Sequence, residues 1–175
     1  ADGTVDETAY DASGNRTSKK DQAGVVTSYT YDLLNRLTKV TDALGGVTTY
    51  GYDELGHKVL QTDANLHATK YGYDALGRRI TRTLPLGQVE TMGYDAVGNL
   101  TSKRDFNGKT TTFAYDLNHR LVSRTPDSSF VGEPATSWTY TATGRRLTMT
   151  DGTGTTSYTY DLRDRLLTKA TPGGT

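Results

Sequence analysis

Residues 26–41 read VTSYTYDLLNRLTKVT, and close copies of this stretch recur along the chain. The pair Tyr-Asp within it returns at steps of 21 residues, then once as Tyr-Thr after 25 residues and again as Tyr-Asp after a further 20. These pairs are Tyr10-Asp11, Tyr31-Asp32, Tyr52-Asp53, Tyr73-Asp74, Tyr94-Asp95, Tyr115-Asp116, Tyr140-Thr141 and Tyr160-Asp161. A fixed period of this length is typical of repeat architectures. We therefore expect residues 1–175 to form a single array of eight repeats.

The composition excludes several classes of protein. Twenty acidic residues balance twenty basic ones, whereas a nucleic-acid partner requires a concentrated basic face. The chain has no cysteine, so disulfides and thiolate metal sites are excluded. No apolar run approaches the roughly 20 residues of a membrane span, and no signal peptide begins at Ala1. We interpret the sequence as a fragment of a longer polypeptide.

Turn signatures occur twice in each repeat. Four residues after the repeat tyrosine stand Gly14, Asn35, Gly56, Gly77, Gly98, His119, Gly144 and Asp164. These residue types accept positive φ most readily. Asp-x-x-Gly is therefore expected to form a type I turn closed by a left-handed residue, which is a three-residue hairpin connection with a bulge. A second such signature, as in Asp42-Ala43-Leu44-Gly45, lies near the middle of the repeat, and this spacing of turns indicates an all-β chain.

The segments between the turns have the alternation of strands. In Tyr50-Gly51-Tyr52 a small residue separates two aromatic ones, and a period of two places both rings on one face. We expect a continuous antiparallel β-hairpin meander of about 16 strands, from about Val5–Tyr10 to about Arg165–Ala170. A sheet this wide rarely stays flat, so it should curl into a spiral band or open shell with its aromatic face inward. The unpaired edge strands would offer sites of self-association.

The turn geometry also predicts a register. Each turn aspartate should face the residue four positions on, and the resulting pairs are Asp32–Arg36, Asp74–Arg78, Asp116–Arg120 and Asp161–Arg165. These aspartates either form ion pairs across the hairpin or serve only as turn formers. The next pair sets Tyr73 opposite Arg79 and Tyr31 opposite Leu37. An Arg or Leu between two such strands is then able to contact two rings.

One segment departs from the repeat. Between Arg124 and Trp138 the turn is lengthened and contains Pro126 and Pro134. Such a protruding loop is the best candidate for a specific contact, with Phe130 and Trp138 as possible partner contacts. The alternative is a tolerated surface insertion.

The motif Tyr-Asp-x-x-Gly-Arg-Leu-Thr, nearly complete in Tyr31 to Thr38, resembles the YD repeat of the Rhs-repeat proteins, and the resemblance extends over essentially the whole chain. Known members are bacterial polymorphic toxins, subunits of insecticidal toxin complexes and the animal teneurins. The resemblance implies a long β-sheet that spirals into a hollow shell, which in bacterial members encloses a C-terminal toxin. The autoproteolytic aspartate block that ends the repeat region in bacterial members has no counterpart here, so the resemblance implies shell wall alone.

No chemistry is predicted from the polar residues. His57 and His119 occupy turn positions and His67 follows another turn, while a metal site requires ligands that converge. No phosphate-binding motif is present. We expect no cofactor, no metal and no enzymatic activity.

Two functions remain open. The first is a structural container, the wall of a β-shell in a secreted, cell-surface or delivered protein, with a C-terminal toxin or the rest of the shell as partner. The second is an extracellular module that binds carbohydrate or protein through aromatic strand residues. The direction in which the aromatic face points distinguishes them.

Overall fold

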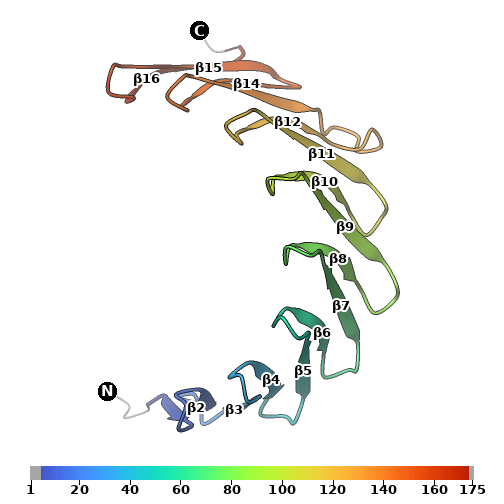
Figure 1. The fold of residues 1–175 in the computed structure, drawn as a ribbon. Coiled ribbons are helices and arrows are strands. Elements are labelled where there is room, and N and C mark those ends of the chain that lie inside the picture. The colour runs from blue at the N-terminus through green and yellow to red at the C-terminus, as the bar shows by residue number, and fades with distance from the viewer. Residues whose placement is uncertain (1–4, 174–175) are drawn as a thin grey trace. The chain divides into compact units, whose positions relative to one another are not determined.

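The protein, as a computed structural model that describes residues 5–173, consists of sixteen β-strands connected by turns. The strands form an antiparallel sheet in which the strand order is the chain order (Figure 1). β1 and β16 are the two ends of this order. The expected hairpin meander is thereby confirmed. Within residues 5–173 no helix provides an apolar stretch that could span a membrane.

The chain divides into two compact units, Ala1–Gln88 and Val89–Thr175. The strands of unit 1 are β1 (Glu7–Tyr10), β2 (Arg16–Lys20), β3 (Val26–Tyr31), β4 (Leu37–Thr41), β5 (Val47–Tyr52), β6 (Lys58–Thr62), β7 (Ala68–Tyr73) and β8 (Arg79–Thr83). The strands of unit 2 are β9 (Val89–Tyr94), β10 (Leu100–Arg104), β11 (Thr110–Tyr115), β12 (Leu121–Thr125), β13 (Thr136–Tyr140), β14 (Arg146–Asp151), β15 (Gly154–Tyr160) and β16 (Leu166–Ala170). Within each unit the successive hairpins are rotated relative to one another, so each sheet segment curves (Figure 1).

Each odd-numbered strand ends at a repeat tyrosine because the turn that follows has a fixed geometry. In the second repeat the Asp32 N–H donates to the Arg36 carbonyl at 3.0 Å, and the Asn35 N–H donates to the Asp32 carbonyl at 3.0 Å. Asn35 has a φ of 59°, and the register shifts between Thr30 and Tyr31. The type I turn, its left-handed residue and its bulge are thus confirmed.

The left-handed position is occupied as predicted even where the residue is not glycine. His119 and Asp164 have φ values of 61° and 58°. Leu66, in a looser copy of the signature, has a φ of 65°, which a leucine adopts only at a cost because its Cβ approaches the following carbonyl. The turn geometry therefore prevails over the local preference of this residue.

The sheet is a single layer, and no hydrophobic side chain among residues 5–173 is fully buried. The buried residues of that range are Pro126 in the loop after β12 and two polar residues, Glu90 and Thr156, each with 6% of its surface exposed. Because no helix or second sheet covers either face, most strand side chains are half-buried against their neighbours on the same face. Side-chain contacts along the sheet must therefore stabilise the fold in place of a packed core.

Candidate functional site

The aspartate of the Tyr-Asp pair is the centre of each turn. One carboxylate oxygen of Asp32, Oδ1, accepts the backbone N–H groups of Leu34 and Arg36, each at 2.9 Å. The other, Oδ2, accepts Nε of the Arg36 guanidinium at 2.8 Å. These bonds, led by the one from the Arg36 backbone N–H, hold the pKa of Asp32 below its ordinary value. The same aspartate therefore both stabilises the turn and forms an ion pair with the arginine.

The same arrangement is repeated along the chain. The Asp-to-Arg Oδ2–Nε distance is 2.7 Å in Asp74–Arg78, 2.7 Å in Asp116–Arg120 and 2.6 Å in Asp161–Arg165. The four ion pairs expected from the register are thus confirmed. The alternative, in which the aspartates only form turns, is wrong for these four repeats.

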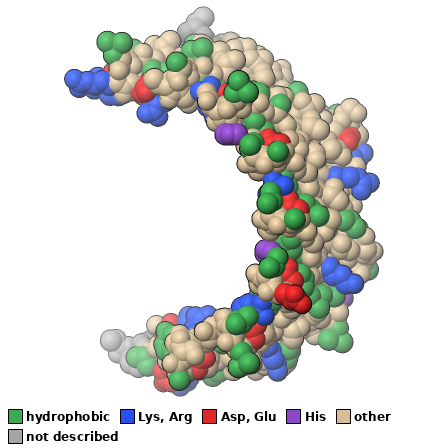
Figure 2. Space-filling view, in the orientation of Figure 1, with side chains coloured by type: hydrophobic (Ala, Val, Ile, Leu, Met, Phe, Trp, Pro, Cys, Tyr) green, Lys and Arg blue, Asp and Glu red, His purple; other side chains and the backbone are tan. Residues whose placement is uncertain are grey.

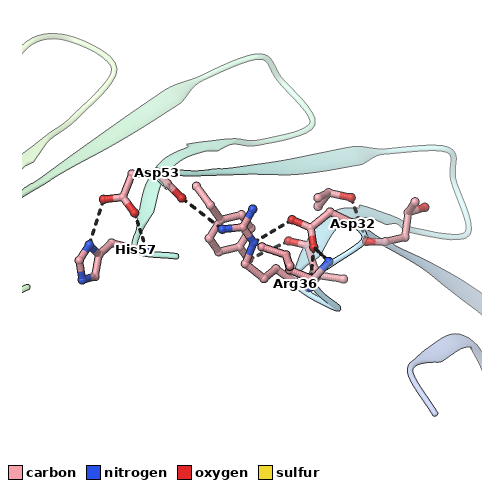
Figure 3. A network of polar contacts seen from close by, with 9 residues as sticks. Asp32, Arg36, Asp53 and His57 are labelled. Atoms are coloured by element: carbon pink, nitrogen blue, oxygen red, sulfur yellow. Dashed lines mark hydrogen bonds and ion pairs between the residues drawn. The ribbon is translucent and has the colours of Figure 1, made fainter. Parts of the chain in front are cut away.

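The arginine also reaches the next repeat, as Figure 3 shows for Arg36. Its Nη1 donates to the Asp53 carbonyl at 3.2 Å, and its Cζ lies 4.8 Å from the centre of the Tyr52 ring. In unit 2, Arg120 makes equivalent contacts with the Thr141 carbonyl at 3.1 Å and with the Tyr140 ring at 4.7 Å. A cation over an aromatic face is attracted to the electron-rich ring. Each such arginine therefore joins two successive turns.

His57 takes the place of the arginine in the next turn. Its Nδ1 lies 2.9 Å from Asp53 Oδ2 (Figure 3). Its ring stacks on that of Tyr73 with the centroids 4.7 Å apart. Desolvation opposes ionisation of Asp53, yet the hydrogen bonds from His57 prevail and lower the pKa of that carboxyl. The histidine that the sequence assigned to a turn is thus part of the same row of contacts.

The repeat tyrosine forms a second contact between successive repeats, through its hydroxyl group. The Tyr52 hydroxyl donates to the Leu37 carbonyl of the preceding repeat at 2.8 Å, and burial raises the pKa of this hydroxyl. Tyr31, Tyr73, Tyr140 and Tyr160 make the corresponding bond, at 3.0, 2.9, 2.6 and 2.8 Å respectively. We use the name turn ladder for the whole set of contacts that joins successive turns. It comprises the aspartate with its paired arginine or histidine, and the tyrosine of the following repeat that this arginine or histidine contacts.

Two further elements of the expected register are confirmed, and one is extended. Tyr73 faces Arg79 and Tyr31 faces Leu37. Lys58 occupies the same position on β6, and its Nζ lies 5.5 Å from the Tyr50 ring and 4.9 Å from the Tyr71 ring. A single cation between two Tyr-bearing strands therefore contacts two rings, as the register predicts.

The repeat tyrosines and aspartates lie at the junctions between strands and turns. Tyr10, Tyr31, Tyr52, Tyr73, Tyr94, Tyr115, Tyr140 and Tyr160 end strands, and Asp11, Asp32, Asp53, Asp74, Asp95, Asp116 and Asp161 begin the turns that follow. Their carboxylates are occupied by backbone N–H groups. Within residues 5–173 no three acidic, histidine or cysteine residues gather as a metal site would require. The turn ladder is thus suited to holding repeats together.

The lengthened loop between β12 and β13 forms a cavity of about 760 Å³ within unit 2. Phe130 and Pro134 supply apolar surface, and Arg124 and Glu133 form an ion pair of 2.9 Å across the loop. Asp127 anchors the loop: its Oδ1 accepts the Ser129 hydroxyl at 2.6 Å, and its Oδ2 accepts the Thr110 N–H at 3.1 Å. The Ser129 side chain is the main cause that lowers the pKa of Asp127 to about 2.

The two aromatic residues expected to contact a partner, Phe130 and Trp138, lie in different places. Phe130 lines this cavity, and it also lines a smaller one of about 280 Å³ together with Phe113. Trp138 lies on β13 opposite Met149, half-buried, and does not line either cavity. The sequence did not indicate the Arg124–Glu133 pair, because nothing in the residue pattern determines how the loop of residues 126–135 folds.

A sequence model of the RHS Repeat family matches residues 10–47, 31–66 and 94–129, which together are more than half of the chain. No curated protein matches the sequence. Among solved structures, the TcdB2-TccC3-Cdc42 crystal structure has a TM-score of 0.74 at 19% identity. TcdB2-TccC3 has a TM-score of 0.73 at 20% identity, and the Photorhabdus luminescens Tc holotoxin pore one of 0.74 at 18%.

In all three comparisons the match covers 95% of this chain and 10% of the other. The chain thus spans a tenth of the length of these relatives. At identities this low the likeness establishes a shared fold, and it agrees with the resemblance noted in the sequence.

Proposed function

The chain belongs to the RHS repeat family, and on this premise we propose that residues 1–175 are one repeat array that forms wall in a β-shell. The shell encloses or displays a toxin at the C-terminal end of the complete protein, which is secreted, presented at the cell surface or delivered to a target cell. Toxin cargo and the remaining shell are then the partners of this segment. It has a structural role and carries out no reaction.

One observation carries this proposal: the sheet is a single layer without a hydrophobic core, stabilised instead by contacts between successive turns. A globular binding domain of this length normally buries a core. A wall needs none, because its stability is approximately the sum over neighbouring repeats. The fold shared with TcdB2-TccC3 supports the same assignment.

Protease protection tests the proposal in the complete polypeptide that contains this array. The region that follows the repeats is expected to resist a protease at concentrations that digest it when it is produced alone. Asp74→Ala removes a carboxylate that accepts two backbone N–H groups of its turn and pairs with Arg78. This variant is expected to increase the rate of cleavage of that region. Leu117→Ala, at a turn residue that is 99% exposed, serves as the matched control and should not. Equal cleavage of the enclosed and isolated regions would refute the container function.

The cavity at the lengthened loop favours a second function, recognition of a glycan or a protein surface. Its volume lies within the range of small-ligand sites, and it combines an aromatic ring with a few polar groups. A glycan array probed with the wild-type chain and with Phe130→Ala tests this function. Binding that is lost in Phe130→Ala and kept in Trp138→Ala would support the cavity as the site. Loss in Trp138→Ala alone would point to the strand face, and no binding by wild type would exclude glycans.

A further inference from the structure

The cavity of about 760 Å³ in unit 2 lies between two segments that touch each other. Phe130 and Pro134 line it from the lengthened loop, and Asp151 and Thr153 line it from the end of β14 and the turn that follows. A Cβ on Gly152 would lie 2.5 Å from Pro134 Cγ, so the loop and the turn are in close contact. Both walls of the cavity are therefore supplied by unit 2 itself.

The floor of the cavity is a row of side chains on one face of the sheet. Arg124 on β12 faces Thr136 on β13. The register of β13 with β14, in which Ser137 faces Thr150, continues so as to set Thr136 beside Asp151. Arg124, Thr136 and Asp151 all line the cavity, and two strand spacings separate Arg124 from Asp151 by about 10 Å. The floor therefore has a cation at one end and a carboxylate at the other.

The charge of Arg124 is already balanced within the cavity. Its Nη2 donates to Glu133 Oε2 at 2.9 Å. Among the residues that line the cavity, Asp151 is then the one charged group without an ion pair. On the face seen in Figure 2, acidic and basic side chains of each unit are interspersed and do not gather by sign. The preference of the cavity for a charged ligand is therefore determined locally, by the carboxylate of Asp151.

The Asp151 carboxylate is held in place and still has a free acceptor site. The Thr153 N–H and hydroxyl donate to its Oδ1 at 2.8 and 2.6 Å. The Thr153 side chain is the main cause that lowers the pKa of Asp151, and the Gly154 N–H contributes to the same shift. An ionised carboxylate accepts about four hydrogen bonds, so Oδ2 is able to accept a donor from a ligand. An ammonium group suits this position, because charge-assisted hydrogen bonds are the strong ones.

The other lining groups favour a sugar as the carrier of this ammonium group. Phe130 offers an apolar ring against which the apolar face of a sugar ring packs. The Thr136 hydroxyl makes no hydrogen bond with residues 5–173, and the hydroxyl groups of a sugar would supply its partner. The alkyl stem of a lysine would instead leave the Thr136 hydroxyl desolvated and unpaired, which costs free energy. A single lysine side chain would also fill only part of the cavity.

We infer that this cavity binds an amino sugar, with the ammonium group on Asp151 and the sugar ring against Phe130. The site is the one for which recognition of a glycan is proposed above, and the requirement for an ammonium group rests on that function. N-acetylation of the amine removes the positive charge, so the acetylated sugar is expected to bind more weakly.

Titration calorimetry at about pH 6, where an amine is protonated, compares two ligands of equal length. One is a short oligomer of glucosamine, and the other is the same oligomer with every amine N-acetylated. Wild type is expected to bind the glucosamine oligomer at least about tenfold more tightly, which corresponds to one hydrogen bond between charged groups. Asp151→Asn should remove this preference, because the amide oxygen still accepts from Thr153 while the charge is lost.

Asp164→Asn is the matched control. It removes one carboxylate from a turn of unit 2 that does not line the cavity. Asparagine suits the φ of 58° at this position, so the turn should be kept and both oligomers should bind as they do to wild type. Phe130→Ala should weaken both oligomers together, because the ring contact does not depend on charge. Circular dichroism checks that each variant retains the fold.

Equal binding of the two oligomers by wild type would overturn the inference and leave glycan recognition in place. The same holds if Asp151→Asn binds the glucosamine oligomer no more weakly than Asp164→Asn does. A third ligand, a short lysine peptide, covers the remaining case. If the peptide bound in an Asp151-dependent manner and neither oligomer bound, the cavity would belong to a protein partner and the amino-sugar inference would be wrong. If none of the three ligands bound, the recognition function itself would be refuted together with the inference.

Discussion

Tyr52→Phe is expected to lower the free energy of unfolding by about 1 kcal/mol and to leave the sheet intact. The substitution removes a hydroxyl that donates to the Leu37 carbonyl at 2.8 Å. A hydrogen bond of this kind contributes roughly 0.5–1.5 kcal/mol net. The ring is retained, so its contact with the Arg36 guanidinium at 4.8 Å remains. The change therefore isolates one link between neighbouring repeats.

The repetition of this bond allows the effect to be multiplied. Tyr31, Tyr73, Tyr140 and Tyr160 donate to carbonyls of their preceding repeats in the same way. Sites about 10 Å or more apart act nearly additively. A fivefold Tyr→Phe variant should then lose roughly 2.5–7.5 kcal/mol, a large part of the 5–15 kcal/mol typical of a folded protein.

Urea unfolding followed by circular dichroism measures both effects by linear extrapolation. Tyr50→Phe is the matched control, because within residues 5–173 the Tyr50 hydroxyl has no hydrogen-bond partner while its ring contacts Lys58. This control should change stability by less than about 0.5 kcal/mol. If Tyr52→Phe cost no more than Tyr50→Phe, the hydroxyl bonds would not hold the repeats together.

Three further substitutions test the turns. Leu66→Gly should raise the free energy of unfolding by up to about 1 kcal/mol, since it relieves a φ of 65° at an exposed side chain; a lower stability in urea would contradict the strain. Gly77→Ala should cost about 1–2 kcal/mol, because φ is 74° and the new Cβ would lie 2.7 Å from His57 Nε2; an unchanged urea midpoint would refute this. The lowered pKa of Asp127, about 2, means that its stabilisation of the loop is complete above pH 3.8 and is lost as the pH falls through about 2. In Asp127→Asn the pH dependence of the Ser129 amide chemical shift between pH 4 and 1.5 should disappear, whereas a wild-type transition near pH 4 would contradict the assignment.

The strands and turns could be predicted because they depend on neighbours in sequence. Asp32 and Arg36 are four residues apart across one hairpin, so the turn type alone determines that they meet. The left-handed φ of Asn35 follows from the same rule. The repeat then carries each local result to the other copies.

The contacts from one turn to the next could not be predicted in the same way. Arg36 reaches the Asp53 carbonyl and the Tyr52 ring only because the twist of the sheet brings the following turn beside it. A pattern of residues specifies which side chains share a face, but not the angle between neighbouring hairpins. The conformation of the Phe130 loop likewise depends on contacts such as that of Asp127 with Thr110, which is distant in sequence.

The account depends on energetic coupling between successive repeats, and a double-mutant cycle between Arg36 and Tyr52 measures it most directly. Arg36→Ala, Tyr52→Leu and the double variant are unfolded in urea, and the cycle cancels the separate loss of the Arg36 contact with Asp32. A coupling energy of about 0.5–1 kcal/mol is predicted for this pair, and none for Arg36 with Tyr73, which is one repeat further on. A coupling energy indistinguishable from zero for Arg36 and Tyr52 would contradict the account.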